Sequence, residues 1–259
     1  MNKNLESLVN TYMPSKKGWW VGRATSAIAI SIRSISMLTE ARKIIVPSTG
    51  CAALVQIVLY EGFKPVYVDL DFKNMSFDKK SILEAIDEDV AAILVVHQLG
   101  MPSNINQIKN LIRKKTTKHI YIIEDVCQAL GGSYNGEKLG SQGDYSVYSF
   151  SGDKIISIGK GGYLGCNNSE IVDITESLIP SLPPMPDIKK MNLLALSHRN
   201  LYHSFVDLQR TNKSISLDFS KYINYYKDLY YFKSNFTDHD LERLEDEFEN
   251  LEKNARIGV

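Results

Sequence analysis

Two kinds of hydrophobic pattern alternate along the first two thirds of the chain. Short apolar runs without helical spacing predict strands at residues 43–46, 65–71, 91–96, 120–124 and 145–150. Runs of this length that are rich in valine and isoleucine are typical of strands buried on both faces. We therefore expect these five segments to form a sheet.

Between the strands, apolar side chains recur every three or four residues. This spacing predicts helices at residues 24–39, 51–62, 78–89 and 104–117, because positions three and four apart share one face of a helix. Strands that alternate with helices indicate a mostly parallel sheet covered by helices on both faces. We therefore predict the α/β class, as a three-layer sandwich.

The pattern changes after about residue 175. Residues 179–187 hold four of the eight prolines and predict a loop, and residues 222–236 are crowded with tyrosine and phenylalanine. We therefore predict a large α/β domain over residues 1–175 and a helical, aromatic-rich extension over residues 176–259.

The end of the extension predicts an amphipathic helix. From residue 238 on, apolar side chains recur at 241, 244, 248 and 251, opposite a charged face. We expect this apolar face to pack against a partner, either a second copy or a complementary chain. The aromatic segment before it suits either a partner or the chain's own sheet.

Composition excludes some classes of function. The 259 residues include 30 basic and 30 acidic side chains, so no net charge favours nucleic acid or an anionic membrane surface. The first residues lack the apolar core of a signal peptide, and no apolar run is long enough to span a membrane. Cys51, Cys127 and Cys166 have neither metal nor disulfide spacing, so we expect a reducing, cytoplasmic compartment.

The histidines do not indicate a metal site. There are five, and they are scattered along the chain. His198 and His203 form the only pair with ligand-like spacing, but no third ligand lies near them in the sequence. We therefore expect no metal.

Polar groups follow the predicted strands where the strands end. In a parallel α/β sheet, ligands bind at the carboxyl ends of the strands, which selects the loops at 21–26, 47–51, 124–129 and 149–154. Asp125 directly follows an apolar strand, so we expect its carboxylate in the interior or in a cleft, with a cationic or donor partner. The ordinary alternative is an aspartate that caps a helix or a turn.

Lys154 follows an apolar strand and a glycine-rich turn. It is either a loop lysine whose stem covers apolar surface or a reactive amine held in a pocket. Ser149 would face the same pocket if the chain turns at Gly152. The small and hydroxylated residues at 24–26 suit an ordinary helix cap, but their N–H groups also suit a phosphate. An amine, a carboxylate and a hydroxyl on neighbouring strand ends together suggest a pyridoxal 5'-phosphate site.

Three blocks of sequence resemble a known family. They are IIVPSTGCAALVQIVLYEGFKPVYVDLD (44–71), AAILVVHQLGMPSNINQI (91–108) and YIIEDVCQALGGSYNGEKLGSQGDYSVYSFSGDKIISIGKGG (121–162). In order and spacing, the chain from about residue 20 to about residue 170 resembles the DegT/DnrJ/EryC1/StrS sugar aminotransferases, pyridoxal-phosphate enzymes of fold type I. The resemblance implies the large domain of that fold, with the carboxyl-terminal small domain missing or reduced.

The resemblance implies a role for each matching residue. Lys154 falls on the lysine of the S-F-x-x-x-K motif and would be the Schiff-base lysine of the cofactor. Asp125 would pair with the pyridinium nitrogen, and Gln128 would lie beside the ring and its phenolic oxygen. Lys154 would then act as the base of amino transfer while Asp125 keeps the ring cationic.

Other matching positions concern the phosphate and the ring face. Ser149 would bind the phosphate together with Ala24, Thr25 and Ser26, which match the family's G/A-T-x loop. Cys51 falls where the family usually places an aromatic residue over the ring, and some relatives carry cysteine there. The resemblance thus adds Cys51 to the cofactor-binding positions.

Two departures from the family pattern are expected to matter. The family's acidic G-E-G-G or G-D-G-G is G-K-G-G here, so Lys160 adds an amine that either binds an acidic substrate or marks relaxed constraint. No small domain is recognisable beyond residue 171, nor the Y-N-x-R-M pattern that supplies an asparagine to the partner subunit's site in the family.

Two function hypotheses follow. The first is a pyridoxal-phosphate-dependent aminotransferase, expected to be a dimer. It would pass nitrogen from an amino acid, usually glutamate in the family, to a keto substrate, usually a nucleotide-linked keto-sugar. The second is a truncated relative that serves as a non-catalytic partner subunit or acts on a smaller substrate. Retention of Lys154, Asp125, Gln128 and Ser149 favours the first. A nucleotide-binding dehydrogenase is disfavoured, because no G-x-G-x-x-G follows a strand.

Overall fold

The computed structural model describes residues 3–184 and 236–257. Within these ranges, seven strands form one sheet in the spatial order β1-β11-β10-β7-β6-β2-β3. Its strands are β1 (Lys17–Val21), β2 (Lys43–Pro47), β3 (Lys64–Val68), β6 (Val90–Val96), β7 (Tyr121–Asp125), β10 (Tyr145–Ser149) and β11 (Gly162–Cys166). Two small hairpins join β4 (Leu70–Asp71) to β5 (Ser76–Phe77) and β8 (Ser133–Tyr134) to β9 (Glu137–Lys138).

Helices connect most of these strands. The α-helices are α1 (Lys3–Tyr12), α2 (Ala24–Ser36), α3 (Ala52–Tyr60), α4 (Lys79–Ala85), α5 (Ile105–Lys115), α6 (Val172–Leu178) and α9 (Asp238–Ile257). Short 3-10 helices occur at Gln98–Gly100, Ser169–Ile171 and Ile179–Ser181. The predicted α/β class is confirmed, and each predicted strand and helix of the first 150 residues corresponds to an observed element.

The sheet is mostly parallel, with one reversal. β10, β7, β6, β2 and β3 pair in parallel, while β11 lies antiparallel to both β10 and β1. The sequence patterns did not predict β1 or β11. Their sequences, KGWWV and GYLGC, contain glycine and lack a run of β-branched residues, so their pairing depends on neighbouring strands.

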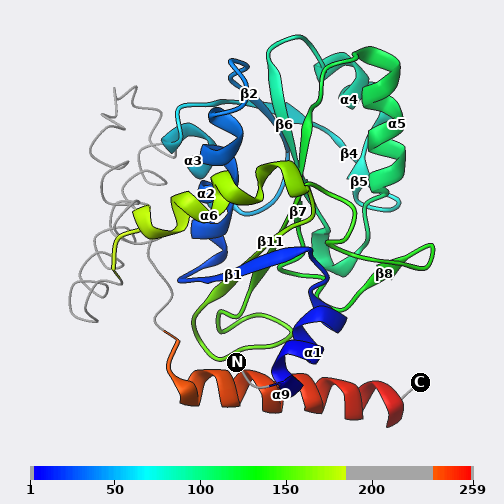
Figure 1. The fold of residues 1–259 in the computed structure, drawn as a ribbon. Helices are drawn as coiled ribbons and strands as arrows, with labels where there is room; N and C mark the ends of the chain where they lie inside the picture. Colours follow the sequence, from blue (N-terminus) through cyan, green and yellow to red (C-terminus); the bar gives the residue numbers. More distant parts are fainter. Residues whose placement is uncertain (1–2, 185–235, 258–259) are drawn as a thin grey trace, which may run out of the picture.

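Helices cover both faces of the sheet (Figure 1). Successive residues of β6 show how: Ala92 and Leu94 join the core beneath α2, α3 and α6, whereas Ile93 and Val95 join the core beneath α4 and α5. This division follows from the two-residue period of a strand. Because both faces are buried, the whole of β6 is apolar and buried.

The last helix is covered by the chain itself. Leu244 and Phe248 of α9 are fully buried and pack with Leu5 and Leu8 of α1, and α1 lies beside α9 in Figure 1. The rings of Tyr12 and Phe248 stack with centroids 5.3 Å apart. The expectation that this face awaits a partner is therefore wrong, because α1 and the sheet occupy it.

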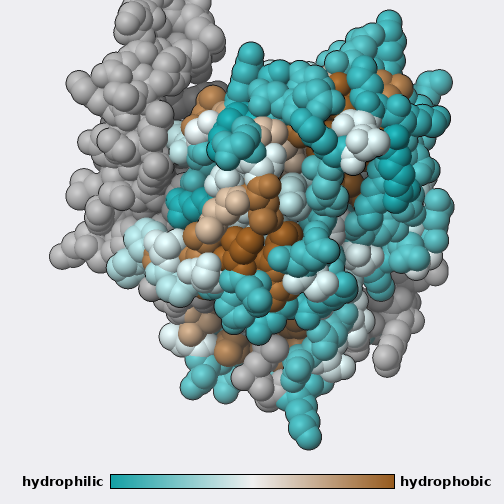
Figure 2. All heavy atoms as spheres, turned by 45° about the horizontal axis from the view of Figure 1, so that its top comes forward, coloured by the Kyte–Doolittle hydropathy of each residue, from teal (hydrophilic) through white to brown (hydrophobic). Residues whose placement is uncertain are grey.

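One face of the molecule is mostly hydrophilic and has a hydrophobic area within it. With the top of Figure 1 turned forward, most of the surface is hydrophilic and one hydrophobic area lies near the middle of the view (Figure 2). No helix in the described ranges is long and apolar enough to cross a membrane.

His198, His203 and residues 222–235 lie outside the described residues, and the domain division at residue 175 stays a prediction.

Candidate active site

Four predicted polar loops meet at one edge of the sheet. Three of these loops follow β2, β7 and β10, which lie with β6 in one parallel run of strands. The fourth, at 21–26, follows β1, which runs in the same direction as β10 because both are antiparallel to β11. The carboxyl ends of these strands therefore lie at one edge. Asp125 at the end of β7 is in register with Val147 of β10 on one side and Val96 of β6 on the other. Loops that are far apart in the sequence therefore converge here.

Asp125 lies at the centre of this edge. Its side chain is buried, and its Oδ1 accepts a hydrogen bond from the Cys127 N–H at 3.0 Å. Its carbonyl oxygen accepts from the His97 N–H at 3.1 Å. The expected burial of this carboxylate is confirmed. Its bond from the N–H two residues further on is also the turn bond of the ordinary alternative, so both features are present.

The Cys127 thiol reports which groups share this environment. Burial raises the pKa of Cys127 well above its usual value, and the negative charge of Asp125 raises it further. The ammonium of Lys154 acts on the same thiol in the opposite sense, and Cys51 also contributes. Asp125, Lys154 and Cys51 therefore all lie near enough to the partly buried Cys127 to act on its charge, although they come from three separate loops.

Lys154 lies in the loop that follows β10. The chain turns at Gly152, as predicted, and the Lys154 N–H donates to the Ser151 carbonyl at 3.2 Å. Its side chain is 18% exposed, and its Nζ lies 3.4 Å from Oδ2 of the exposed Asp153. Low exposure of the side chain fits both an amine held in a pocket and a loop lysine whose stem covers apolar surface, so the role of Lys154 stays a prediction.

Ser149 and the start of α2 lie close together. Ser149 pairs in register with Gly162 of β11, and a Cβ added to Gly162 would lie 2.6 Å from the Ala24 nitrogen. Only glycine at 162 lets the helix start approach the strand this closely. The N-cap residue Arg23 makes no side-chain capping bond.

The predicted phosphate residues at the start of α2 differ in access. Ala24 and Thr25 are partly exposed, whereas Ser26 is fully buried. The Ser26 N–H donates to the Arg23 carbonyl at 3.0 Å. The structure therefore brings the partly exposed Ala24 and Thr25 toward the buried Ser149, while Ser26 lies in the core.

Two glutamines connect the loops around the edge. Gln128 is exposed, and its Oε1 accepts from the Leu99 N–H at 2.7 Å. Gln98 donates through Nε2 to the Thr49 carbonyl at 2.9 Å. Sequence reasoning missed Gln98, although a polar residue two places after an apolar strand was the available signal. The two side chains fasten the loops after β2, β6 and β7 to one another.

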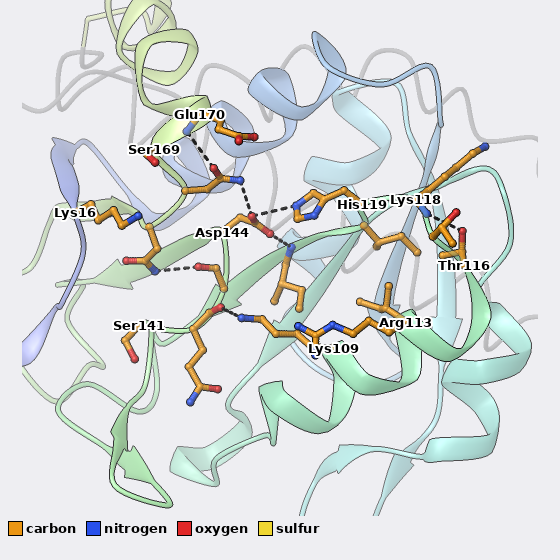
Figure 3. A pocket seen from close by; sticks show the side chains of 18 residues that line it. Lys16, Lys109, Arg113, Thr116, Lys118, His119, Ser141, Asp144, Ser169 and Glu170 are labelled. Carbon is orange, nitrogen blue, oxygen red and sulfur yellow. Dashed lines mark hydrogen bonds and ion pairs between the residues drawn. The ribbon is translucent and has the colours of Figure 1, made fainter.

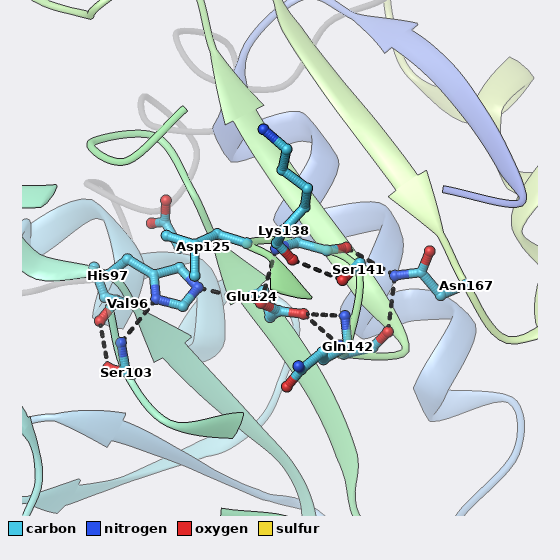
Figure 4. Close-up of polar contacts among 12 residues, drawn as sticks. Val96, His97, Ser103, Glu124, Asp125, Lys138, Ser141, Gln142 and Asn167 are labelled. Atoms are coloured by element: carbon cyan, nitrogen blue, oxygen red, sulfur yellow. Dashed lines mark hydrogen bonds and ion pairs between the residues drawn. The ribbon is translucent and has the colours of Figure 1, made fainter. Parts of the chain in front are cut away.

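A buried hydrogen-bond network surrounds Glu124, the residue before Asp125 (Figure 4). Glu124 is fully buried, and its carboxylate accepts hydrogen bonds from the N–H groups of Gly140, Gln142 and Gly143. His97 Nε2 lies 3.2 Å from the same carboxylate. His97 Nδ1 accepts from the Ser103 N–H at 3.0 Å, so the ring proton is on Nε2.

This network has a structural consequence. Because Nδ1 is an acceptor, His97 is neutral and donates through Nε2 to the ionised Glu124. The backbone N–H groups of residues 140–143 donate to the same carboxylate. A carboxylate so buried is stable only when its oxygens are fully hydrogen-bonded. Glu124 therefore holds the loops 97–103 and 140–143 in place on either side of β7. The sequence analysis did not identify it.

A cavity of the described part of the chain lies at the other edge of the sheet. It measures about 800 Å³ and is found at the amino-terminal edge of the strands, lined among others by Lys109, Arg113, His119, Asp144 and Glu170 (Figure 3). None of the predicted site residues lines it. Among the described residues, no group of His, Cys, Asp and Glu side chains is arranged to hold a metal ion.

The polar groups of this cavity bind one another. Asp144 accepts from the Ile122 N–H at 2.8 Å, from Asn168 Nδ2 at 3.0 Å and from His119 Nε2 at 3.2 Å. The hydrogen bond that His119 donates to Asp144 raises the pKa of His119, against the effect of burial. Lys109 donates to the Gln142 carbonyl at 2.5 Å. The cavity is therefore a poorer candidate than the carboxyl edge, despite its size.

Comparison with known proteins gives a family match over most of the chain. The profile of the DegT/DnrJ/EryC1/StrS aminotransferase family matches residues 1–180. The GDP-perosamine synthase of Escherichia coli O157:H7 is 31% identical over 153 residues, which cover 59% of this chain and 41% of that protein. The UDP-N-acetyl-3-dehydro-alpha-D-glucosamine 3-aminotransferase of Acidithiobacillus ferrooxidans is 32% identical over 148 residues, covering 57% of this chain and 39% of that protein.

A solved structure shares the fold. A crystal structure of GDP-4-keto-6-deoxymannose-3-dehydratase with a trapped PLP-glutamate geminal diamine superposes with a TM-score of 0.60 at 25% identity, covering 68% of this chain and 47% of that chain. The chain spans about two fifths of the length of the curated relatives it matches.

Proposed function

We propose that the chain, which belongs to the DegT/DnrJ/EryC1/StrS aminotransferase family, binds pyridoxal 5'-phosphate at the carboxyl edge of its sheet and carries out amino transfer to a sugar. The observation that carries the proposal is that the buried Asp125 ends β7 beside β10, whose own end carries Ser149 and leads into the loop with the largely covered Lys154. The names of the relatives support it, because they include a sugar 3-aminotransferase and perosamine synthases.

The residues present fit the phosphate of this cofactor. The start of α2 lies against Gly162, which pairs with Ser149. A helix amino terminus offers N–H groups and a favourable dipole to an anion. Ser149 Oγ lies 3.0 Å from Ser151 Oγ, so two hydroxyl groups adjoin the helix start. Ala24, Thr25 and Ser149 would hold the phosphate, with Ser26 supporting the helix from within.

The residues also fit the ring. The Asp125 carboxylate would bind the pyridine N–H and keep the ring cationic, since an ionised carboxylate favours a protonated partner. Gln128 would lie beside the ring, held by its bond to the Leu99 N–H, and Cys51 would lie over a ring face. When bound, the cofactor supplies an electron sink that stabilises negative charge developing on the substrate carbon.

Lys154 has two tasks in this proposal. Its amine would bond covalently to the cofactor aldehyde and be displaced by the amino group of the donor. The free Nζ would then accept a proton from the donor's α-carbon. In the second half of the reaction it would return a proton to the acceptor carbon that receives the nitrogen. The largely covered side chain of Lys154 would hold Nζ on one side of the ring.

The finer chemistry is proposed from the relatives. We propose glutamate as the amino donor and a nucleotide-linked keto-sugar as the acceptor, supported by the PLP-glutamate adduct named for one structure and the sugar nucleotides named for others. We propose a cytoplasmic protein, because its cysteines are free. We propose a homodimer or a complex with a complementary chain, supported by the exposed Leu99 and Ile155 at the rim of the site.

The test is an absorbance spectrum of the purified protein with added pyridoxal 5'-phosphate. We expect a visible band, a borohydride-trapped adduct on the peptide that contains Lys154, and bleaching of the band by glutamate. Lys154→Ala should lose the band and the adduct. Lys118→Ala is the matched control, because Lys118 is exposed and pairs with Glu88, and it should behave as wild type. Absence of the band from the wild type would refute the proposal and favour a non-catalytic partner subunit.

A further inference from the structure

Lys160, which stands where the family has an acidic residue, forms an ion pair within the fold. Its Nζ lies 2.8 Å from Oδ2 of Asp240, and the two side chains are 30% and 9% exposed. Asp240 belongs to the first turn of α9, more than seventy residues further along the chain. Lys160 is therefore engaged with α9 and is not directed at a substrate.

Asp240 is itself held in place. Its Oδ2 also accepts from the Thr237 N–H at 2.8 Å and from Thr237 Oγ1 at 2.7 Å, while the Asp240 N–H donates to Thr237 Oγ1 at 3.2 Å. This reciprocal arrangement is a helix cap. Burial opposes ionisation, but the hydrogen bonds from Lys160 and Thr237 outweigh it and lower the pKa of Asp240 to about 2. Asp240 is therefore a fixed anion at neutral pH.

Other contacts join the same loop to the same helix. Arg243 Nη1 lies 3.5 Å from the Ile158 carbonyl, and Ile156 and Ile158 are buried in the core that contains Phe248. Gly161, at φ 96°, lies against the Phe236 ring, where a Cβ would lie within 3 Å of it. The loop between β10 and β11 thus rests on α9 over most of its second half.

The first half of this loop carries Lys154. The turn around Gly152 and Asp153 is exposed, so the position of Lys154 depends on where the second half of the loop is fastened. The loop returns to the sheet at Gly161, whose N–H donates to the Gly22 carbonyl at 3.2 Å. Gly22 precedes the start of α2, so the same fastening joins the Lys154 loop to the phosphate side of the site.

We infer that the Lys160–Asp240 ion pair is a positioning element of the cofactor site, which fastens the Lys154 loop to α9. The inference rests on the proposed function, since it concerns the same cofactor. It assigns α9 a role in holding the amine in place and gives the reversed charge at residue 160 a reason. Neither Lys160 nor Asp240 touches the reacting atoms in this proposal.

The test compares three site variants with a control. Lys160→Met keeps the stem and removes the charge, Asp240→Asn keeps an oxygen for Thr237 and removes the charge, and Lys160→Arg keeps a cation. Lys253→Met is the control, because it removes an ion pair to Glu249 on the same helix away from the loop. The measured quantities are the Kd of pyridoxal 5'-phosphate from the visible band, and amide hydrogen exchange of the cofactor-free protein.

We expect Lys160→Met and Asp240→Asn each to raise the cofactor Kd by about tenfold, and the double variant to raise it no further, since the two side chains form one interaction. Lys160→Arg should restore the Kd to within about twofold, and Lys253→Met should leave it unchanged. Exchange should accelerate in residues 151–161 and not in the sheet.

Three outcomes would overturn the inference. They are an unchanged Kd in both charge-removing variants, exchange that accelerates equally throughout the sheet, and an effect of Lys253→Met as large as that of Lys160→Met. If the wild type itself forms no band, the proposed function fails. The exchange comparison still tests the fastening of the loop in that case, so the two failures are distinguishable.

Discussion

The two edges of the central sheet each carry an aspartate with little exposure, Asp144 with 13% of its side chain exposed and Asp125 with 7% of the residue exposed, but the surroundings of the two differ. At the amino edge, Asp144 is surrounded by donors from Ile122, His119 and Asn168. At the carboxyl edge, Asp125 accepts from the Cys127 N–H, and Lys154 makes only a 3.4 Å contact with an exposed carboxylate. The larger cavity lies at the amino edge, yet its polar groups satisfy one another. Polar groups that are not already bound to one another therefore indicate a ligand site better than the volume of a cavity does.

The largest effect expected from this comparison is on catalysis by Asp125→Asn. Asparagine keeps the oxygen that accepts from the Cys127 N–H, so the fold should persist. It removes the charge that keeps the ring cationic, so amino transfer should fall by at least about 100-fold, or roughly 3 kcal/mol in the barrier. The measurement is the rate at which glutamate bleaches the visible band.

The matched control is Asp144→Asn at the amino edge. It should lower the free energy of unfolding by about 1–2 kcal/mol, because a largely buried carboxylate with three donors is weakened, while leaving the rate per folded molecule within about twofold. A large rate loss in Asp144→Asn, or none in Asp125→Asn, would remove the distinction between the two edges.

A smaller effect, on stability, is expected from Glu124→Gln. The amide would direct N–H groups at the backbone donors of residues 140–143 or at His97, and an unpaired buried donor is costly. The free energy of unfolding should fall by about 3 kcal/mol, measured by urea denaturation. Glu137→Gln, on the exposed strand β9, should change it by less than about 0.5 kcal/mol. Similar losses in the two variants would contradict the role assigned to Glu124.

The smallest effect concerns His119. Its pKa is raised in the folded state by the hydrogen bond to Asp144, so its contribution to stability is full below the usual histidine pKa and disappears as the pH rises through the raised value. His119→Gln should therefore cost more at pH 5.5 than at pH 8.5. The difference should be at most about 0.5 kcal/mol, because the side chain is 59% exposed.

The control for this pH dependence is His239→Gln. His239 lies on the exposed side of α9 with a long 3.9 Å contact to Glu242, so its loss should give no comparable difference between the two pH values. A cost of His119→Gln that grows with pH would reverse the sign derived from the raised pKa. Unfolding in urea at the two pH values measures both variants.

Hydrophobic spacing was sufficient for the parallel half of the fold. The apolar run at 91–96 predicted β6 because a strand buried on both faces has no polar positions. The same reasoning failed for β1 and β11, whose tryptophans and glycines give no periodic signal. It also failed for α9, because an amphipathic helix looks the same in sequence whether its own chain or a partner covers it.

The candidate site divides in the same way. Burial of Asp125 was predictable because this residue directly follows an apolar run. Lys154 was noted for its place between an apolar strand and a glycine-rich turn, and the roles of both residues rest on the family resemblance. Gln98, Glu124 and His97 were not identified, since each lies beside a stronger signal in the sequence. Their importance follows from partners 27 or more residues away, which no local pattern contains.

The sequence by itself determined the α/β class, the order of the parallel strands along the chain and the residue types that chemistry requires at the strand ends. These depend on local periodicity and on the rule that parallel strands end at one edge. Tertiary structure alone decided that Ser26 is in the core, that α1 covers α9, and that Lys160 is paired with Asp240. The reason is physical: burial and ion pairing are properties of contacts between distant segments, and a charge such as that of Lys160 acquires its role from the partner that the fold brings to it.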